Sequence, residues 1–483
     1  MDNRVFYTLV ILFCSSFLVA QNLTDALRYS ALDFGSTARA VGSGSALGAL
    51  GADFSVMSTN PAGLGWFRRS EFVFTPGVTT SNTQSKFLNS SNKGLTEDNR
   101  VVFNLSSLGA VITSRPRNTD WTTVNFGIGF NRVADFNQKF YFQGASKGSI
   151  VNRFLEIANS DVALNDFESN IAYNAESIYD IDDDGFYESD FELEPDAIIN
   201  REQIVLSKGS ISELGMSLAG SYKDVALFGV TLGVPFVSFT EEKTYSEIDN
   251  NNEVPFFDDL EYRENLTTTG IGINLKAGVI VRPHQAIRLG VAIHTPTAYS
   301  LEDNYKSALT YNYTDGDAFT GQDSTEGLFE YKLRTPWRYI GSVGLIIGKM
   351  GFLSAEVESL DYGKNRFNFD TFASEERTAN DSIINNLSDA MNIRLGGEIA
   401  YDIFRFRAGY GLYYSPFASD DTVNNSFSLG FGIREQSFFM DLAYRRRSYS
   451  EGYIPYLASE SPQQLIDNEV NNDYFLLTFG FKF

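Results

Sequence analysis

The last ten residues of the chain alternate between two kinds of side chain. From Phe475 to Phe483 every odd-numbered residue is apolar, whereas the intervening positions include Thr478, Gly480 and Lys482. A period of two is the period of a pleated β-strand, because successive side chains point to opposite faces. The C-terminus is therefore predicted to be a strand with one uniformly apolar face.

The same alternation recurs along most of the chain. It predicts about fourteen strands, which begin near residues 70, 99, 121, 209, 225, 259, 286, 327, 351, 390, 404, 424, 437 and 473. Alternation alone does not say which face points outward. A soluble sandwich with its apolar faces inward is therefore an alternative at this point.

The connections between these strands alternate in length. Short turns are expected around residues 115–120, 222–225, 282–285, 348–351, 401–404 and 434–437. Long polar loops lie between them, and the largest runs from about residue 144 to 208. Short periplasmic turns on one rim and long extracellular loops on the other are typical of a bacterial outer-membrane barrel. The sequence thus predicts an all-β fold, a transmembrane antiparallel β-barrel over residues 70–483, in a Gram-negative outer membrane.

Hydropathy agrees with a barrel. After residue 20 no apolar run reaches the roughly 18 residues that a membrane helix needs, and a closed barrel is the other structure that can span lipid. Residues 1–20 are predicted to be a signal peptide: Arg4 precedes the apolar stretch Val5–Leu18, and Ala20 precedes a cleavage point at Gln21. An N-terminal membrane anchor is the alternative. The only cysteine, Cys14, lies in this segment, so we expect no disulfide or thiolate site in the mature chain.

The charge balance limits the partners. The chain has 61 acidic and 38 basic residues, with a formal net charge of -23. We expect many of the acidic residues in the outer loops, where divalent cations would bridge them to one another or to lipopolysaccharide; a merely solvated acidic rim is the alternative. The same balance disfavours nucleic acid as a partner.

Residues 21–69 have a different composition from the strands that follow. Asn22–Leu32 is compatible with a short helix, and Gly35–Gly65 is rich in Gly, Ala and Ser. We expect this segment to form an irregular hatch, or plug, inside the barrel lumen. Asn60, Pro61 and Ala62 are candidate gate residues, because proline fixes φ and the glycines that follow permit close approach. A turn that simply packs the plug is the alternative.

Several short motifs resemble those of the outer-membrane long-chain fatty acid and hydrocarbon transporter family (FadL and TodX). In chain order they are Asn60-Pro61-Ala62, Gly278-Val279-Ile280-Val281-Arg282-Pro283, Leu289-Gly290-Val291-Ala292-Ile293-His294-Thr295-Pro296-Thr297, Thr335-Pro336-Trp337, Arg407-Ala408-Gly409-Tyr410 and the terminal Phe483. The resemblance covers nearly all of the mature length. No single motif is specific, but their order on about fourteen strands is.

The resemblance implies passive transport of hydrophobic compounds such as long-chain fatty acids. It implies capture outside, a hatch in the lumen, and lateral exit through an inward kink of the third strand. That strand would be roughly Trp121 to Phe142, and Asn131 and Arg132 interrupt its alternation. Barrels of similar fold also act as non-transporting scaffolds or secretion accessories, which is the rival function. We expect outer-membrane lipid around the barrel, and the assembly machinery to recognise Phe483.

Two groups of charged residues are further candidates. Arg394, Glu398, Arg405 and Arg407 share the predicted lumen face of two strands, as a salt-bridge network that anchors the hatch or as groups that handle ligand or protons. Asp180, Asp182, Asp184 and Glu188, with Gly185, occupy positions of a calcium loop whose last ligand is replaced by Phe191. A solvated acidic loop is the alternative to bound Ca²⁺.

Catalysis has little support in the sequence. The chain has 2 histidines, His284 and His294. They are predicted to lie in a periplasmic turn and near the outer end of a strand, too few for a His-rich metal site. We therefore expect no enzyme activity and no cofactor other than the possible Ca²⁺.

Overall fold

The computed structural model describes residues 23–91, 94–160, 164–314, 318–319, 323–459 and 461–483. The predicted signal peptide and Gln21 lie outside the described residues.

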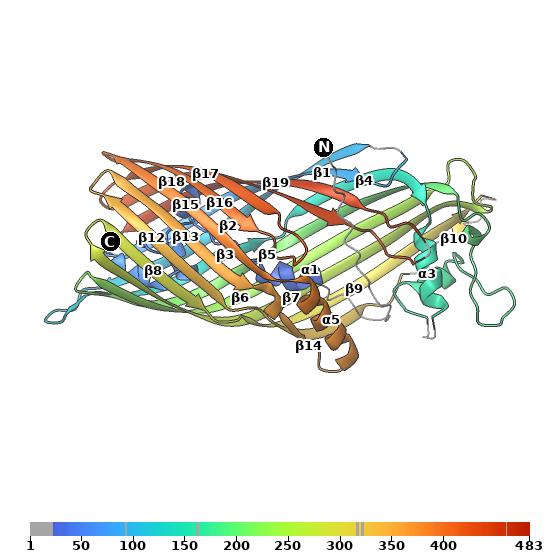
Figure 1. Ribbon diagram of the computed structural model, residues 1–483, viewed down its shortest axis with the longest axis horizontal. Coiled ribbons are helices and arrows are strands. Elements are labelled where there is room, and N and C mark those ends of the chain that lie inside the picture. The colour runs from blue at the N-terminus through green and yellow to red at the C-terminus, as the bar shows by residue number, and fades with distance from the viewer. Residues whose placement is uncertain (1–22, 92–93, 161–163, 315–317, 320–322, 460) are drawn as a thin grey trace.

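The wall of the molecule is one closed antiparallel sheet (Figure 1). It closes where the last strand pairs with the first, from Glu71↔Lys482 to Phe87↔Ile466. The uninterrupted wall strands are β1 (Glu71–Phe87), β2 (Leu95–Ser114), β5 (Ile198–Tyr222), β6 (Ala226–Ile248), β7 (Phe257–His284), β15 (Asp389–Tyr401), β16 (Phe404–Tyr414), β17 (Val423–Arg434), β18 (Phe438–Tyr453) and β19 (Ile466–Lys482).

Four further wall strands are each interrupted. They are β3 (Trp121–Asp135) with β4 (Gln138–Lys147), β8 (Ile287–His294) with β9 (Ala298–Tyr313), β12 (Arg338–Ile347) with β11 (Gly327–Arg334), and β13 (Gly351–Asp361) with β14 (Arg366–Asn368). The short β10 (Ala318–Phe319) pairs with β9. The barrel therefore has 14 strands, and the predicted fold class is confirmed.

The apolar face of the barrel points outward. On β8, Ile287, Leu289, Val291 and Ile293 are 39–65% exposed, whereas Gly290 and Ala292 between them are buried. The other wall strands show the same pattern, which a soluble sandwich would reverse. The sandwich alternative is therefore wrong.

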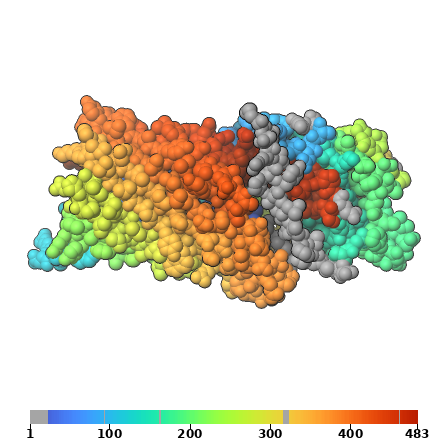
Figure 2. Space-filling model, in the orientation of Figure 1, coloured from blue at the N-terminus to red at the C-terminus, as the bar shows by residue number. Residues whose placement is uncertain are grey.

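The two ends of the barrel differ as their connections predict. The short turns and the C-terminus lie at one end (Figure 1), and the residues of the longest loop gather at the other end (Figure 2). By the rule for bacterial barrels the first end is periplasmic and the second extracellular. The longest loop runs over 148–197, not 144–208, because β5 already begins at Ile198. The sequence did not predict the first residues of β5 as strand, because that part of the wall projects beyond lipid, where outward side chains need not be apolar.

The height of the wall is uneven. Strands β5, β6 and β7 have 25, 23 and 28 residues, whereas β15, β16 and β17 have 13, 11 and 12. On the low side, η4 (Tyr362–Lys364) lies between β13 and β14, and α5 (Ala373–Asn386) lies in the connection from β14 to β15. On the high side, α3 (Ile150–Ala158), α4 (Ser169–Asn174) and η3 (Asp190–Glu192) pack in an apolar cluster with the outer ends of the strands. We call this cluster the outer cap.

The N-terminal residues 23–67 lie inside the barrel and are almost entirely buried. They contain α1 (Leu23–Ser30), α2 (Ala38–Gly42), η1 (Phe54–Ser58) and η2 (Pro61–Trp66). We call residues 23–67 the plug. None of the helices in the described ranges is long and apolar enough to cross a membrane.

Candidate functional site

The contact between the plug and the inner wall is the candidate functional site. Its centre is the turn Asn60–Ala62, which begins η2. Asn60 caps this helix, since its Oδ1 accepts a hydrogen bond from Ala62 N at 3.2 Å, and Pro61 occupies the first helical position. The Asn60 amide also donates to Gly48 O at 2.8 Å, and the side chain is fully buried. The turn is thus fixed by its own sequence before it contacts the wall.

A pair of wall glycines receives this turn. Gly229 of β6 and Gly278 of β7 are register partners. A methyl group on Gly229 would collide with the Pro61 backbone, and one on Gly278 would collide with Asn60 Oδ1. The wall and the turn can meet only because neither position carries a side chain.

Further glycines repeat the arrangement on the low side of the barrel. The end of α2 reaches the wall at Gly409 and Gly430, where an added Cβ would strike the backbone of Gly44 and Gly42. Gly109 and Gly129, a register pair of β2 and β3, make room for the ring of Phe54. Wall glycines therefore make room for the plug at three places, for its backbone at two of them and for an aromatic ring at the third.

Buried charges give the plug polar anchors. Arg394 pairs with Glu356 at 3.0 Å and with Glu358 at 2.8 Å, and all three side chains are at most 2% exposed. The second oxygen of Glu356 accepts a hydrogen bond from Gly48 N of the plug at 2.9 Å. Arg338 pairs with Glu358 and donates to Ser30 O at 2.9 Å. This cluster joins β12, β13 and β15 to two points of the plug.

The other three predicted lumen charges form a second cluster nearer the periplasmic end. Arg407 bridges Glu398 and Asp441, each at 2.7 Å. Arg405 and Arg39 of the plug approach the same Glu398, each with Nε at 3.9 Å from a carboxylate oxygen. The structure thus brings Glu398, Arg405 and Arg407 together and places Arg394 in the other cluster. Whether any of them handles ligand or protons stays a prediction.

The two histidines lie in different surroundings. His294, at the end of β8, is 4% exposed, and its Nε2 donates to Thr59 O of the plug at 2.6 Å. Its ring also meets Phe34 edge to face at 5.9 Å. His284 is exposed at the periplasmic turn, where its Nδ1 accepts from Ala286 N at 3.2 Å. His294 therefore belongs to the plug contact.

The wall is incomplete at the third strand. β2 pairs with β3 only between Ser107↔Asn131 and Ser114↔Val124. Beyond Asn131 the register with β5 shifts between Arg132 and Ala134, and β3 ends at Asp135 before β4 begins. In the described ranges no ladder of hydrogen bonds joins β4 to β2. We call this interval between β2 and β3–β4 the seam.

Side chains bridge the seam in place of backbone bonds. Lys139 pairs with Asp98 at 2.8 Å, Arg100 donates to Asn137 Oδ1 at 3.4 Å, and Thr96 Oγ1 donates to Tyr141 O. Asn131 points inward, where its amide donates to Ser58 Oγ of the plug at 3.1 Å. One side of the seam is therefore in direct contact with the plug.

The acidic loop has its carboxylates turned to its own backbone. Asp180 accepts from Asp184 N at 3.1 Å and from Gly185 N at 2.9 Å, and Asp184 accepts from Phe186 N. Asp182 and Glu188 complete the predicted set, but within the described ranges no three His, Cys, Asp or Glu side chains are grouped to hold a metal. In the outer cap, Asp190 accepts from Tyr179 at 2.9 Å and from Tyr311 at 3.1 Å. Burial there raises the pKa of the Asp190 carboxyl.

Sequence reasoning did not identify two parts of this site. The alternation places the wall glycines that contact the plug, such as Gly229 and Gly278, on the inward face of their strands. It does not show which residues they contact, because those residues lie far away in the sequence. Asp33 of the plug pairs with Arg445 of β18 at 2.9 Å, and no local pattern marks Asp33 as an anchor.

Solved structures share this architecture. A Pseudomonas aeruginosa FadL homologue has 14% sequence identity and a TM-score of 0.53, over 92% of this chain and 98% of that one. The Pseudomonas putida toluene transporter TodX has 11% identity and a TM-score of 0.53, over 93% and 98%. The Ralstonia pickettii toluene transporter TbuX has 13% identity and a TM-score of 0.50, over 93% and 99%. No family model and no curated protein matches the sequence.

The family resemblance that the motifs predicted is thus confirmed at the level of the fold. The chain forms a closed barrel of 14 strands whose outer face is apolar, and similar solved structures share this architecture. It is therefore a multi-pass β-barrel of the outer membrane.

Proposed function

We propose that this chain, which has the fold of the FadL homologue and of TodX, carries hydrophobic compounds such as long-chain fatty acids passively across the outer membrane. The similar solved structures include toluene transporters. The observation that carries the proposal is the combination of a filled lumen with a wall that lacks backbone hydrogen bonds at one seam. A solute that cannot pass straight through the plug has a sideways route into lipid there.

The seam suits an apolar solute. Outside it, β2 presents Val101, Phe103 and Leu105, which are 55%, 83% and 44% exposed, toward lipid. Three side-chain contacts need to part, Asp98 with Lys139, Arg100 with Asn137 and Thr96 with the Tyr141 carbonyl, and each contributes about 1 kcal/mol. Lateral exit therefore costs little, and the solute never has to enter water.

The plug supplies a means of gating. Ser58 precedes the Asn60–Ala62 turn and accepts the hydrogen bond of Asn131 at the edge of the seam. A shift of this turn would therefore reach the seam through a single side chain. In the same proposal the ligand is captured at the extracellular end of the barrel, where the outer cap lies.

Cross-linking the seam tests this route. In a Cys14→Ser background, Asp98→Cys and Lys139→Cys would be joined by a short bis-methanethiosulfonate reagent, which forms a reducible disulfide with each thiol. The matched control is Lys208→Cys with Glu242→Cys, an ion pair of 2.5 Å across the continuous β5–β6 ladder. Uptake of labelled oleate would be measured in vesicles whose outer leaflet contains lipopolysaccharide.

We expect the seam cross-link to reduce uptake at least tenfold and a reducing agent to restore it, with the control pair unaffected. Equal uptake by vesicles with and without the protein would remove the transport proposal and leave the scaffold function. Normal uptake through a cross-linked seam would remove the lateral route alone.

A further inference from the structure

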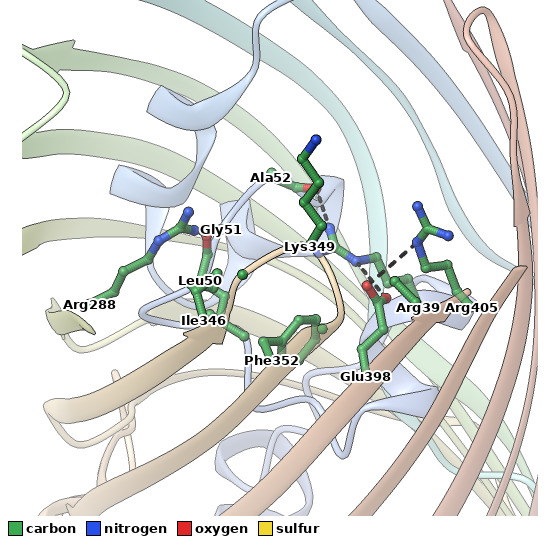
Figure 3. A pocket seen from close by; sticks show the side chains of 13 residues that line it. Arg39, Leu50, Gly51, Ala52, Arg288, Ile346, Lys349, Phe352, Glu398 and Arg405 are labelled. Carbon is green, nitrogen blue, oxygen red and sulfur yellow. Dashed lines mark hydrogen bonds and ion pairs between the residues drawn. The ribbon is translucent and has the colours of Figure 1, made fainter. Parts of the chain in front are cut away.

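A cavity of about 290 Å³ opens beside the plug at the periplasmic end of the lumen. It lies between the plug loop Leu50–Ala52 and the ends of β12, β13, β15 and β16 (Figure 3). Lys349, in the turn after β12, is exposed at its rim, so the cavity communicates with the periplasm. It lies on the opposite side of the plug from the outer cap and does not belong to the seam.

Positive charge dominates the lining. Arg39, Arg288, Lys349 and Arg405 line the cavity, and Glu398 is its one carboxylate among the lining residues. Glu398 is already engaged by Arg407 at 2.7 Å, outside the lining. In the described part of the chain, Arg288 and Lys349 form no ion pair at all. Arg39 also pairs with Asp53 at 4.0 Å, so the uncompensated positive charge of the lining belongs to Arg288 and Lys349, in a protein whose formal net charge is -23.

The plug holds two of these guanidinium groups in place. Arg288 donates to Leu50 O at 2.7 Å, and Arg39 donates to Ala52 O. The Nε atom of Arg288 is buried and has no hydrogen-bond partner among the described residues, whereas the Nε atom of Arg39 faces the Glu398 carboxylate at 3.9 Å. Arg288 is further confined by the ring of Trp66, whose centroid lies 4.3 Å from the guanidinium carbon. Donors that are oriented but unsatisfied favour an oxyanion.

Part of the cavity wall is apolar and lies between Arg288 and Arg405 (Figure 3). Leu50, Ile346 and Phe352 line it, and Leu50 and Phe352 belong to the apolar cluster between plug and wall. Inorganic phosphate would use the cations and leave this wall unused. A carboxylate with a short hydrocarbon tail would use both.

We propose that this cavity binds small amphiphilic carboxylates from the periplasmic side, with the carboxylate at Arg288 and Lys349 and the tail against Ile346 and Phe352. The site is independent of the proposed transport route, because neither the seam nor the outer cap contributes to it.

The test uses a thiol as a local probe of charge. Cys14 is the only cysteine, so in a Cys14→Ser background Ala400→Cys, in the cavity lining, gives a single thiol. Its reaction rate would be compared for an anionic and a cationic methanethiosulfonate reagent of similar size. We expect the anionic reagent to react at least about tenfold faster, since a cleft of one sign concentrates the opposite charge. We expect hexanoate to slow that reaction more than phosphate or hexanol at equal concentration.

Two sets of variants control the result. Arg288→Gln with Lys349→Gln should reduce the preference for the anionic reagent at least about threefold, with Arg39 and Arg405 still in the lining, and should abolish protection by hexanoate. Lys223→Gln removes a cation from another periplasmic turn, paired with Asp120 at 3.3 Å, and should change nothing. Equal rates in the parent protein, or equal protection by phosphate and hexanoate, would overturn the proposal. None of these readouts depends on oleate uptake, so failure of one proposal leaves the other standing.

Discussion

At the scale of single residues, the absence of a side chain is what allows the plug and the wall to meet. Gly278 shows this most clearly, because an added methyl group would collide with Asn60 Oδ1, which caps η2. The Asn60–Ala62 turn cannot yield easily, since Asn60 is also bonded to Gly48. A substitution here therefore acts on the position of the plug.

We expect Gly278→Ala to lower stability by about 1–3 kcal/mol, the usual cost of forcing a group into a packed interior. We also expect it to raise ion conductance through the barrel in a planar bilayer. The control is Gly341→Ala in β12, where an added Cβ would have no neighbour within 4 Å. The same conductance for both variants would show that the turn tolerates displacement without opening the lumen.

The outer cap contains a buried carboxyl group, that of Asp190, whose negative charge is disfavoured by its burial. Burial raises the pKa of Asp190 above its ordinary value of 3.8, so the folded cap binds a proton more tightly than the unfolded loop. The stability of the cap is then greatest below that ordinary value and falls as pH rises through the raised pKa. We expect hydrogen exchange in residues 148–197 to accelerate over this interval, and Asp190→Asn to remove the pH dependence. An unchanged pH profile in the variant would assign the effect to another group.

At the scale of elements, the clearest energetic question is the ion-pair cluster between β13 and β15. Among the described residues Arg394 is the only ion-pair partner of Glu356, and it shares Glu358 with Arg338. Removing it leaves a buried carboxylate without a countercharge, which typically costs about 3–5 kcal/mol. We expect Arg394→Gln to reduce the free energy of unfolding in lipid vesicles by roughly that amount.

Lys208→Gln is the matched control for that measurement. Lys208 and Glu242 also pair across neighbouring strands, but their side chains are 38% and 44% exposed. Exposed pairs contribute at most about 1 kcal/mol. Similar losses for the two variants would mean that the lumen around Arg394 is wet enough to screen its charges.

The strands were predictable from the sequence to the extent that they cross lipid. Lipid favours apolar side chains at the outward positions, so segments such as 287–293 can be recognised as strands by their alternation. The first residues of β5, from Ile198, project beyond lipid. Asn200 and Glu202 lie there, so the apolar alternation that marks the other strands is missing. The length of the high side of the barrel was therefore underestimated.

The site was predictable only in part, for a related reason. The Asn60–Pro61–Ala62 turn is a local structure, and its cap and proline can be recognised in a few residues. The glycines that receive it, the Asp33–Arg445 anchor and the seam depend on which strands are neighbours and in which register. Alternation carries no information on register, because every strand repeats the same pattern.

At the scale of the whole molecule, the plug occupies a lumen that water would fill if the plug were absent. The inner face carries Arg394, Glu356, Arg445 and Asp441, together with many hydroxyl groups and glycines. Water can solvate these groups if the plug is removed, while the outer apolar face stays in lipid. The barrel is therefore expected to persist without the plug, although the chain is packed around it.

Deletion of Gln21 to Leu64 tests whether the plug is what makes the barrel impermeable. We expect discrete conductance steps in a planar bilayer and entry of small polar solutes into vesicles, where the full chain permits neither. Gly278→Ala should lie between the two, because it disturbs one contact of the plug and leaves the anchors at Asp33 and Gly48 in place. The control is that the deleted chain still requires detergent for solubility and has a strand-rich circular dichroism spectrum. If such a chain gives no conductance steps, the barrier to solutes lies in the outer cap and not in the plug. The apolar cluster of the outer cap contains no residue of the plug, so it would remain in the deleted chain.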